Sequence, residues 1–278
     1  MNIPQIPRAC VIGWPVKHSR SPIIHNYWLK TFGLAGAYEL AEIEPEHLAA
    51  FVHSLPQKGY RGGNVTVPHK EEVLPLCDHL TARARAIGAV NTLWFEGDML
   101  HGDNTDALGF AANLDDYAPE WRKARRAMVL GAGGAARAIV YALREAGIEQ
   151  IVVVNRDQAR AQSLKTLWHG AFNVADWASL GDYLPETDLL INTTSLGMKG
   201  QPPLLLPWEK TRAGLIVHDI VYVPLETDLL KAARAHGYKT VEGLGMLLHQ
   251  AAPGFAHWFG RTPQVTAELR QLVLDAIG

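Results

Sequence analysis

The stretch Ala127-Met128-Val129-Leu130-Gly131-Ala132-Gly133-Gly134-Ala135-Ala136 decides the fold of this chain. A short apolar strand runs directly into the pattern G-x-G-x-x-G/A, and an apolar helical segment follows to about Glu145. In this context the first glycine permits a tight turn, the second lets the backbone approach a pyrophosphate, and Ala136 allows close packing of helix on strand. The stretch predicts a dinucleotide-binding α/β domain. A glycine-rich turn without a ligand is the alternative.

The end of the next expected strand, residues 151–154, indicates which dinucleotide binds. Asn155, Arg156 and Asp157 follow it, and Arg160 comes one turn later. An arginine suits a 2′-phosphate because its planar fork can pair two phosphate oxygens. We therefore predict NADP(H). NAD(H) stays an alternative because Asp157 brings a negative charge to the same corner, and the arginines could instead form a solvated face.

Apolar strand-like runs alternate with helical segments along almost the whole chain, which predicts an α/β fold with a largely parallel sheet. The 278 residues suit two domains. We expect a first domain of residues 1–110 plus 245–278 and a dinucleotide-binding domain of residues 111–244. The expected strands are residues 9–13, 37–43, 59–65, 89–95, 127–130, 151–154, 188–192 and 215–219, with a hairpin turn at Glu96-Gly97-Asp98. The expected helices include residues 22–32, 45–55, 81–87, 244–259 and 263–277, and the last two are expected to pack back on the first domain.

Composition excludes several classes of protein. Lys and Arg number 26 against 28 Asp and Glu, a formal charge of −2, so no positive field would attract nucleic acid or an anionic membrane. Cys10 and Cys77 form no CxxC pair and no zinc-like cluster, which indicates neither a disulfide framework nor a metal and fits a reducing cytoplasm. The sequence contains no run of 18 apolar residues, so it predicts no membrane-spanning helix.

Three polar clusters in the first half follow expected strands, where α/β sheets place their ligands. They are Gly13 to Pro22, Asn64 to Lys70, and Gly102 to Asp106. Ser21 is predicted to cap a helix that begins at Pro22, which would put two serine hydroxyls beside a positive helix end suited to a carboxylate. Pro68 is predicted to start a helix that bears Lys70.

Lys70 and Asp106 are the candidates for proton transfer, since a lysine can act as an acid or base and a carboxylate can orient it. Each alone would more often be a surface charge. Together with Asn91 they make a concentration of polar groups that packing does not explain.

The chain resembles the shikimate dehydrogenase family over essentially its whole length. The matching stretches, in order, are HSRSP, NVTVPHK, IGAVNT, GDNTD, GAGGAARA, NRD with Arg160, INTTSLGM, DIVYVPLETDLL and EGLGMLLHQA. The resemblance implies a substrate domain and a Rossmann module for NADP(H) that meet at a cleft. It also implies the reversible NADPH-dependent reduction of 3-dehydroshikimate to shikimate, in the pathway to the aromatic amino acids.

The resemblance further assigns roles to single residues. Lys70 and Asp106 would be catalytic, and shikimate would bind to Ser19, Ser21, Thr66, Lys70, Asn91, Asp106, Tyr222 and Gln250. The cofactor would bind to Gly131, Ala132, Gly133, Gly134, Ala135, Asn155, Arg156, Arg160, Ile220, Gly243 and Met246. The family more often has Thr or Ser at the position of Asp157.

Two other functions stay open. One is an NAD-dependent quinate/shikimate dehydrogenase of the same fold, because crowding near Ser19, Ser21 and Tyr222 would decide whether the extra hydroxyl of quinate is admitted. The other is an inactive NADP-binding regulator, against which the presence of both Lys70 and Asp106 argues. The expected partner is the small-molecule substrate, no metal is expected, and the sequence leaves a homodimer open.

Overall fold

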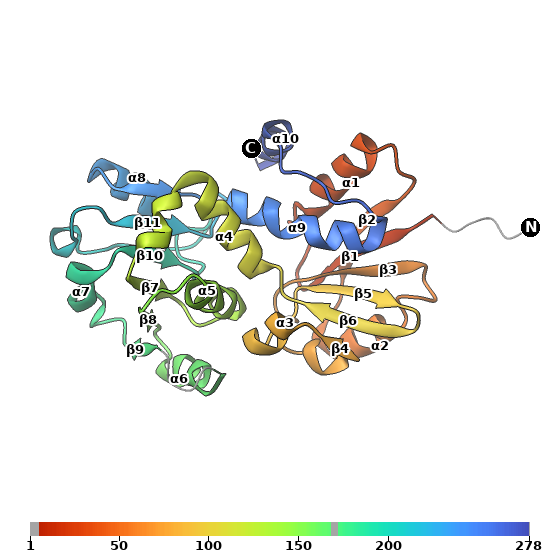
Figure 1. Cartoon of the computed structure of the whole chain (residues 1–278), viewed down its shortest axis with the longest axis horizontal. Coiled ribbons are helices and arrows are strands. Elements are labelled where there is room, and N and C mark those ends of the chain that lie inside the picture. Colours follow the sequence, from red (N-terminus) through yellow and green to blue (C-terminus); the bar gives the residue numbers. More distant parts are fainter. Residues whose placement is uncertain (1–5, 168–171, 278) are drawn as a thin grey trace, which may run out of the picture. The chain divides into compact units, whose positions relative to one another are not determined.

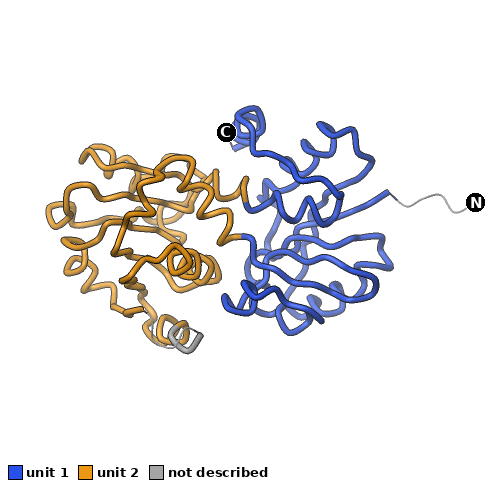
Figure 2. The backbone as a smooth tube through the Cα atoms, in the orientation of Figure 1, with its two compact units in different colours: residues 1–105, 250–278 blue, residues 106–249 orange. Residues whose placement is uncertain are grey.

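The computed structural model describes residues 6–167 and 172–277. Its backbone separates into two compact units, of which unit 1 comprises residues 1–105 and 250–278 and unit 2 residues 106–249 (Figure 2). Each unit is built on one six-stranded sheet with helices packed around it (Figure 1). The fold class is α/β, as predicted.

The sheet of unit 1 has the strand order β2-β1-β3-β5-β6-β4. Parallel pairing joins β1 to β2, β1 to β3 and β4 to β6, whereas β5 runs antiparallel to β3 and β6. The predicted hairpin joins β5 to β6, and Gly97 supplies the positive φ of 61° that its turn requires. The strands are β1 (Arg8–Gly13), β2 (Ala37–Glu42), β3 (Tyr60–Val65), β4 (His79–Leu80), β5 (Thr92–Glu96) and β6 (Met99–Asp103).

Three helix predictions in unit 1 need correction. Helix α1 (Ser21–Thr31) has Arg20, and not Ser21, at its N-cap. The Ser19 hydroxyl accepts the first-turn backbone N–H of Ser21 at 3.3 Å. Residues 67–73 form turns instead of the helix predicted from Pro68, because a helix there would have to end before Pro75. Helix α10 (Ala267–Ile277) begins after residue 266, whose hydroxyl caps it, and not at residue 263.

The remaining helices of unit 1 are short, apart from α9 (Leu244–Phe259), whose first residues belong to unit 2. They are η1 (Pro45–His47), α2 (Leu48–His53), η2 (Leu74–Leu76) and α3 (Ala82–Ile87). The Trp258 indole N–H of α9 donates to the Leu93 carbonyl at 2.8 Å, which ties the C-terminal segment to the sheet.

An aromatic cluster joins α1 to α9 inside unit 1. His25 is fully buried and stacks on the Tyr38 ring, with 4.0 Å between centroids and 16° between planes. Trp28, Phe255 and Trp258 surround the same imidazole. Burial lowers the pKa of His25 to about 3, so the imidazole is neutral and serves packing, as a histidine without a ligand partner should.

The sheet of unit 2 is parallel throughout, with the order β12-β11-β10-β7-β8-β9. From β7 the chain moves outward through β8 and β9 and then returns to β10 on the other side of β7. This reversal is the switch point at which α/β sheets bind ligands. The strands are β7 (Arg126–Leu130), β8 (Gln150–Val154), β9 (Asn173–Ala175), β10 (Leu189–Asn192), β11 (Ile216–Asp219) and β12 (Lys239–Val241).

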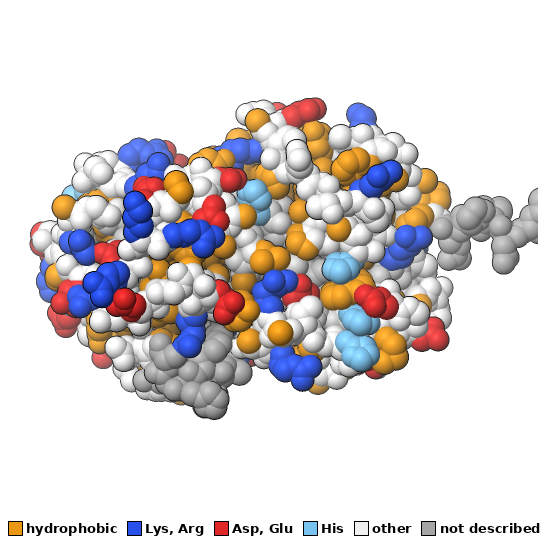
Figure 3. Space-filling view, viewed as in Figure 1, with side chains coloured by type: hydrophobic (Ala, Val, Ile, Leu, Met, Phe, Trp, Pro, Cys, Tyr) orange, Lys and Arg blue, Asp and Glu red, His pale blue; other side chains and the backbone are white. Residues whose placement is uncertain are grey.

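The helices of unit 2 enclose an aliphatic core that includes Met128, Leu190 and Val217. They are α4 (Asp106–Tyr117), η3 (Pro119–Lys123), α5 (Gly134–Glu145), α6 (Gln158–Leu167), α7 (Leu180–Tyr183), η4 (Leu184–Glu186), η5 (Trp208–Lys210) and α8 (Asp228–Ala235). On the face seen in Figure 3, basic and acidic side chains are interspersed over this unit. Of the helices in the described residues, none combines the length and the hydropathy that a bilayer crossing requires.

Candidate active site

Sheet pairing collects the predicted substrate residues of unit 1 at one edge. Strands β1, β3 and β6 end at this edge and the antiparallel β5 begins there, because Ile12 pairs with Val65 and Thr92 pairs with Asp103. The segments that leave these strand ends carry Ser19 and Ser21, Thr66 and Lys70, and Asn91. Polar groups far apart in sequence therefore face the same end of the sheet.

The two serines after β1 lie together. Ser19 Oγ donates to Ser21 Oγ at 3.2 Å, and the same oxygen accepts the Ser21 backbone N–H. Ser21 is buried and Ser19 half-buried, at the N-terminal end of α1. Two hydroxyls beside the positive end of a helix dipole are suited to a carboxylate.

Asn64 belongs to the same edge, although the sequence analysis left it out of the substrate residues. Tyr38 Oη donates to Asn64 Oδ1 at 2.7 Å, and Asn64 Nδ2 donates to the Asn91 carbonyl at 3.1 Å. Burial raises the pKa of Tyr38, so this phenol stays a donor. The alternation of Asn64 with Thr66 was the signal that could have identified it.

Main-chain bonds set the place of Lys70. Its carbonyl accepts the Val90 N–H at 2.7 Å, which puts Lys70 beside the segment that carries Asn91. The Lys70 side chain is half-buried, as is that of Thr66, whose backbone N–H donates to the Ile12 carbonyl at 2.8 Å. The main chain of Lys70 thus lies at the edge where hydroxyl and amide groups collect.

Asn91 and Gln250 are brought together from positions 159 residues apart. Asn91 Nδ2 donates to Gln250 Oε1 at 3.4 Å, and both residues are buried. Asp106 and Tyr222 belong to unit 2: Asp106 is buried as the first residue of α4, and Tyr222 is half-buried in the segment after β11.

The glycine loop has the geometry that the sequence predicts. Gly131 has a φ of 107°, and a Cβ on it would lie 2.6 Å from the Thr193 hydroxyl oxygen, so only glycine fits. Gly133 stands at the N-cap of α5, and among the described residues no side chain caps that helix. Its first N–H groups can therefore serve an anion such as a pyrophosphate.

The end of β8 and the start of α6 lie against this loop. The Asn155 backbone N–H donates to the Ala175 carbonyl at 3.3 Å, and the Arg160 guanidinium Nε donates to the Ala132 carbonyl at 3.2 Å. Arg156 is exposed between them. The Arg160 side chain therefore lies next to the loop, and Arg156 follows the same strand end, where the 2′-phosphate of NADP would lie relative to its pyrophosphate.

The Arg156→Ala variant should raise the KM for NADP⁺ by roughly 10- to 100-fold, the loss expected for one or two bonds to a charged group. The KM for NAD⁺ should change little, because NAD⁺ lacks the phosphate. Initial rates against each cofactor measure this, with Arg125→Ala, an exposed arginine before β7, as the matched control. Equal losses with NADP⁺ and NAD⁺ would remove the 2′-phosphate role.

Asp157 caps helix α6. Its Oδ1 accepts the Arg160 backbone N–H at 3.1 Å, and its carbonyl accepts from Asn155 Nδ2 at 2.6 Å. The carboxylate is therefore held at the N-terminus of α6, where it opposes a phosphate approaching the same helix end. Its use as a cap is a structural reason for a capping side chain at this position, a role that Ser or Thr could also fill.

The Asp157→Thr variant should lower the KM for NADP⁺ several-fold, because threonine keeps the cap and removes the negative charge. The KM for NAD⁺ and the melting temperature should stay close to those of the parent. Asp157→Ala is the paired control, since it removes both charge and cap and should cost about 1 kcal/mol of stability. An unchanged KM for NADP⁺ in the threonine variant would mean that the carboxylate does not act on the phosphate.

Asp219 organises the loops after β10 and β11, although it is not among the predicted site residues. The buried carboxylate accepts from Thr227 Oγ1 at 2.7 Å, Asn192 Nδ2 at 2.9 Å and the Val221 N–H at 3.0 Å. Burial raises the pKa of Asp219 to about 6, against the three donors, which lower it. The group thereby shapes the segment that carries Ile220 and Tyr222.

Asp219 should make stability depend on pH. Its pKa is about 6 in the native chain and near 4 when unfolded, so the native state binds more protons between these values. Its contribution to the free energy of unfolding is therefore full below about pH 4 and is lost as the pH rises through 6. In Asp219→Asn this gain is absent, so denaturant unfolding should show the variant falling further behind the parent from pH 7 to pH 4.5. The exposed Asp228→Asn variant controls for charge, and a pH-independent difference for Asp219→Asn would contradict the assignment.

Of the three remaining cofactor candidates, Gly243 lies close to Ile220 in space and close to Met246 in the chain. A Cβ on Gly243 would lie 2.2 Å from the Ile220 carbonyl oxygen, so this close approach requires glycine. Met246 follows in the first turn of α9 and is buried. They line the continuation of the loop that Asp219 shapes.

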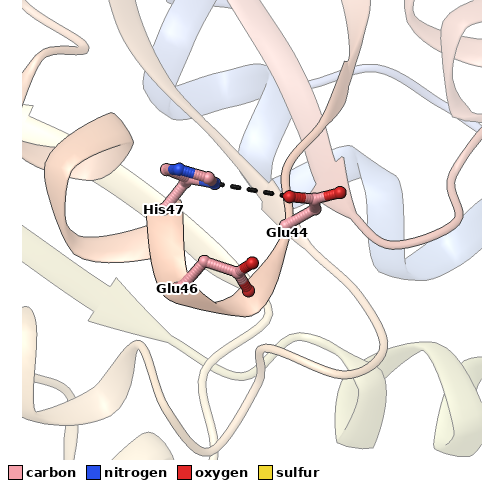
Figure 4. A group of neighbouring side chains, drawn as sticks. All are labelled: Glu44, Glu46 and His47. Atoms are coloured by element: carbon pink, nitrogen blue, oxygen red, sulfur yellow. Dashed lines mark ion pairs between the residues drawn. The ribbon is translucent and has the colours of Figure 1, made fainter.

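Among the described residues, one group of possible cation ligands follows β2. Glu44, Glu46 and His47 gather after β2, with 3.6 Å between His47 Nδ1 and Glu44 Oε2 (Figure 4). Glu46 and His47 are exposed and Glu44 is half-buried. Exposed acidic groups of this kind are common without an ion, and we assign no metal to them.

Comparison with known families covers most of the chain. Residues 11–93 match the model described as shikimate dehydrogenase substrate binding domain. Residues 117–198 match that of shikimate / quinate 5-dehydrogenase, and residues 243–274 that of the shikimate 5′-dehydrogenase C-terminal domain.

Individual relatives agree with these matches. The chain is 54% identical over 269 residues to shikimate dehydrogenase (NADP(+)) of Afipia carboxidovorans, covering 97% of each chain. Among solved structures, shikimate 5-dehydrogenase of Thermus thermophilus in complex with NADP(H) and shikimate has a TM-score of 0.85 at 36% identity, covering 98% of each chain. Quinate dehydrogenase of Corynebacterium glutamicum in complex with NAD has a TM-score of 0.90 at 31% identity, covering 97% of this chain and 99% of that one.

Proposed function

The chain belongs to the shikimate dehydrogenase family, and from this premise we propose how its residues divide the work of the reaction. The activity is the reversible, NADPH-dependent reduction of 3-dehydroshikimate to shikimate, in the pathway to the aromatic amino acids. The chain is thus an oxidoreductase, and its cofactor is NADP(H).

We assign most of the substrate-binding residues to unit 1, with Asp106 and Tyr222 from unit 2, and all of the cofactor-binding residues to unit 2. The observation that carries this division is the gathering of hydroxyl, amide and ammonium groups at one edge of the unit 1 sheet. In unit 2 the open N-terminus of α5 follows the glycine loop at the switch point. A polyol carboxylate needs the first set of groups, and a dinucleotide needs the second.

For the substrate, Ser19 and Ser21 take the carboxylate, because their hydroxyls lie 3.2 Å apart beside a helix N-terminus. The ring hydroxyls form hydrogen bonds with amide, hydroxyl and carboxylate side chains, namely those of Asn64, Thr66, Asn91, Asp106, Tyr222 and Gln250. Such fixed partners orient the substrate before the reaction and so lower its barrier.

For the chemistry, NADPH when bound supplies the hydride that reduces the C3 carbonyl. Lys70 donates the proton that the carbonyl oxygen gains, and takes it back when shikimate is oxidised. Its positive charge also stabilises negative charge as this develops on that oxygen. Asp106 orients the Lys70 ammonium.

For the cofactor, the backbone of Gly131 to Ala135 holds the pyrophosphate, and Asn155, Arg156 and Arg160 hold the 2′-phosphate. Ile220, Gly243 and Met246 line the nicotinamide. The free thiols Cys10 and Cys77 support a reducing, cytoplasmic location.

The test is the absorbance of NADPH in four assays that pair shikimate or quinate with NADP⁺ or NAD⁺. The pair of shikimate with NADP⁺ should have the highest kcat/KM. In addition, Ser21→Ala should weaken shikimate binding and leave the Kd for NADP⁺ unchanged, because Ser21 lies in unit 1 and all the proposed cofactor residues lie in unit 2. A Kd for NADP⁺ that worsens equally would contradict the division between units.

A second candidate function is the oxidation of quinate with NAD⁺. The acid at Asp157, held beside the 2′-phosphate residues, is the observation that favours it. A higher kcat/KM for quinate with NAD⁺ than for shikimate with NADP⁺ would establish this candidate instead.

A further inference from the structure

A buried threonine lies behind the substrate amides of unit 1. Thr105 has no exposed surface, and its backbone N–H donates to Asn91 Oδ1 at 2.8 Å. Its hydroxyl donates to the Gln250 carbonyl at 2.8 Å, and the same oxygen lies 3.1 Å from both Asn91 Oδ1 and Thr92 Oγ1. Thr105 therefore holds two segments at once: the side chain of Asn91 and the main chain of α9 at Gln250.

These bonds decide which way the Asn91 amide is turned. Asn91 Oδ1 accepts from the Thr105 N–H and from the Thr92 hydroxyl, the latter at 2.9 Å. A flipped amide would direct its NH₂ group at these donors and would lose both bonds. The observed orientation instead points Asn91 Nδ2 toward Gln250 Oε1, at 3.4 Å. Asn91 thus offers its donor on the side where Gln250 lies.

The main chain around Thr105 reinforces this arrangement. The Asn91 N–H donates to the Asp103 carbonyl at 2.9 Å, and the Asn104 side chain donates to the Ala89 carbonyl at 3.0 Å. Two further hydrogen bonds therefore hold residues 103–105 against residues 89–91. The Thr105 hydroxyl links these two segments to the main chain of α9, in addition to the side-chain bond between Asn91 and Gln250.

We propose that Thr105 is a positioning residue for the substrate, acting through Asn91 and Gln250 without touching the substrate itself. Its N–H sets the direction of the Asn91 amide, and its hydroxyl sets the distance of α9, and so of the Gln250 side chain, from Asn91. This inference rests on the proposed roles of Asn91 and Gln250 in binding the shikimate hydroxyls. It adds the group that makes the two amides act together.

The inference makes a distinct statement about the hydroxyl. Valine has nearly the shape of threonine, and a helix carbonyl keeps its own main-chain partner, so Thr105→Val should fold with α9 intact. What it loses is the hydroxyl, which bonds to the α9 carbonyl of Gln250 and lies 3.1 Å from Asn91 Oδ1 and Thr92 Oγ1. The loss should therefore fall on substrate binding more than on catalysis by bound substrate.

The first experiment compares Thr105→Val with Thr105→Ser in steady-state kinetics. Thr105→Val should raise the KM for shikimate about tenfold, as expected for one lost hydrogen bond in a binding site. Its kcat should fall less than this, and its KM for NADP⁺ should stay unchanged. Thr105→Ser retains the hydroxyl and should restore most of the affinity. Equal rises in the shikimate KM for valine and serine would overturn the proposal.

Thr187→Val is the matched control for the loss of a buried hydroxyl. Thr187 is buried in unit 2 and its hydroxyl also donates to a carbonyl at 2.8 Å, that of Tyr183. This variant should lower the melting temperature about as much as Thr105→Val does and leave the shikimate KM unchanged. A similar rise of the shikimate KM in the control would show a general effect of stability and would overturn the proposal.

The second experiment repeats Thr105→Val in an Asn91→Ala background. If Thr105 acts through Asn91, the valine change should raise the shikimate KM by a clearly smaller factor there than in the parent. The same factor in both backgrounds would overturn the positioning role. An Asn91→Ala variant with an unchanged shikimate KM would instead overturn the proposed substrate site, and with it the premise that Thr105 positions a substrate group.

Discussion

Lys70→Ala is expected to lower kcat by roughly 10²- to 10⁴-fold, the usual contribution of a positioned general acid or base. The KM for shikimate should change little, because the proton transfer is made in the transition state and not on binding. The hydrogen bond from the Val90 N–H to the Lys70 carbonyl holds the Lys70 main chain beside Asn91, so the side chain starts from a fixed position. Steady-state rates in both directions measure the effect.

Two further variants separate the possible roles of this lysine. Lys70→Met keeps most of the aliphatic stem and should lose kcat as Lys70→Ala does, whereas an effect of packing alone would be smaller in methionine. Lys58→Ala, at an exposed lysine over the Phe51 ring, should leave kcat unchanged. A near-normal kcat with a collapsed affinity for shikimate in Lys70→Ala would make Lys70 a substrate anchor, with another group moving the proton.

Asp106→Asn is expected to reduce kcat by a factor comparable to that of Lys70→Ala. Asparagine keeps the shape and one acceptor of the carboxylate and loses the charge that orients the ammonium. Asp106 is buried at the first position of α4, where a negative charge also suits the helix dipole, so the melting temperature should be measured alongside kcat. A drop in kcat at an unchanged melting temperature is the expected result.

The double variant decides whether Lys70 and Asp106 act together in proton transfer. If they do, Lys70→Ala with Asp106→Asn should be little slower than either single variant, because the second change removes an interaction already lost. Losses in kcat that multiply would show two independent contributions. In that case the paired acid–base role would have to be given up.

The fold of unit 2 was predictable because its signals are local. Gly131 needs its positive φ within a strand–loop–helix segment, and the residues that specify this turn lie next to one another. The longer strands of unit 2 were predicted for the same reason, since each is a continuous apolar run. The short strands β4, β9 and β12, of two or three residues, carry no periodicity and were not predicted.

Where local signals failed, a neighbouring residue competed with them. Pro68 suits the first turn of a helix, yet Pro75 would limit that helix to about two turns, which have little stability of their own, and the segment forms turns. Ser21 has the chemistry of an N-cap, yet Ser19 lies close enough to accept its N–H and the helix begins one residue earlier than predicted. Both predictions were wrong because each rested on a single residue, whereas a second residue nearby also determines the local structure.

The sequence by itself thus determined the α/β class, the glycine loop and, through resemblance, the residue types of the candidate site. Only the tertiary structure decided how Asn91 faces Gln250, that Asp157 caps α6, and that Thr105 joins two distant segments. The physical reason is range: φ preferences, caps and periodicity act over one turn of chain, whereas an amide orientation depends on donors that only folding brings into contact. The raised pKa of Asp219 belongs to the second kind, because burial exists only in the folded chain.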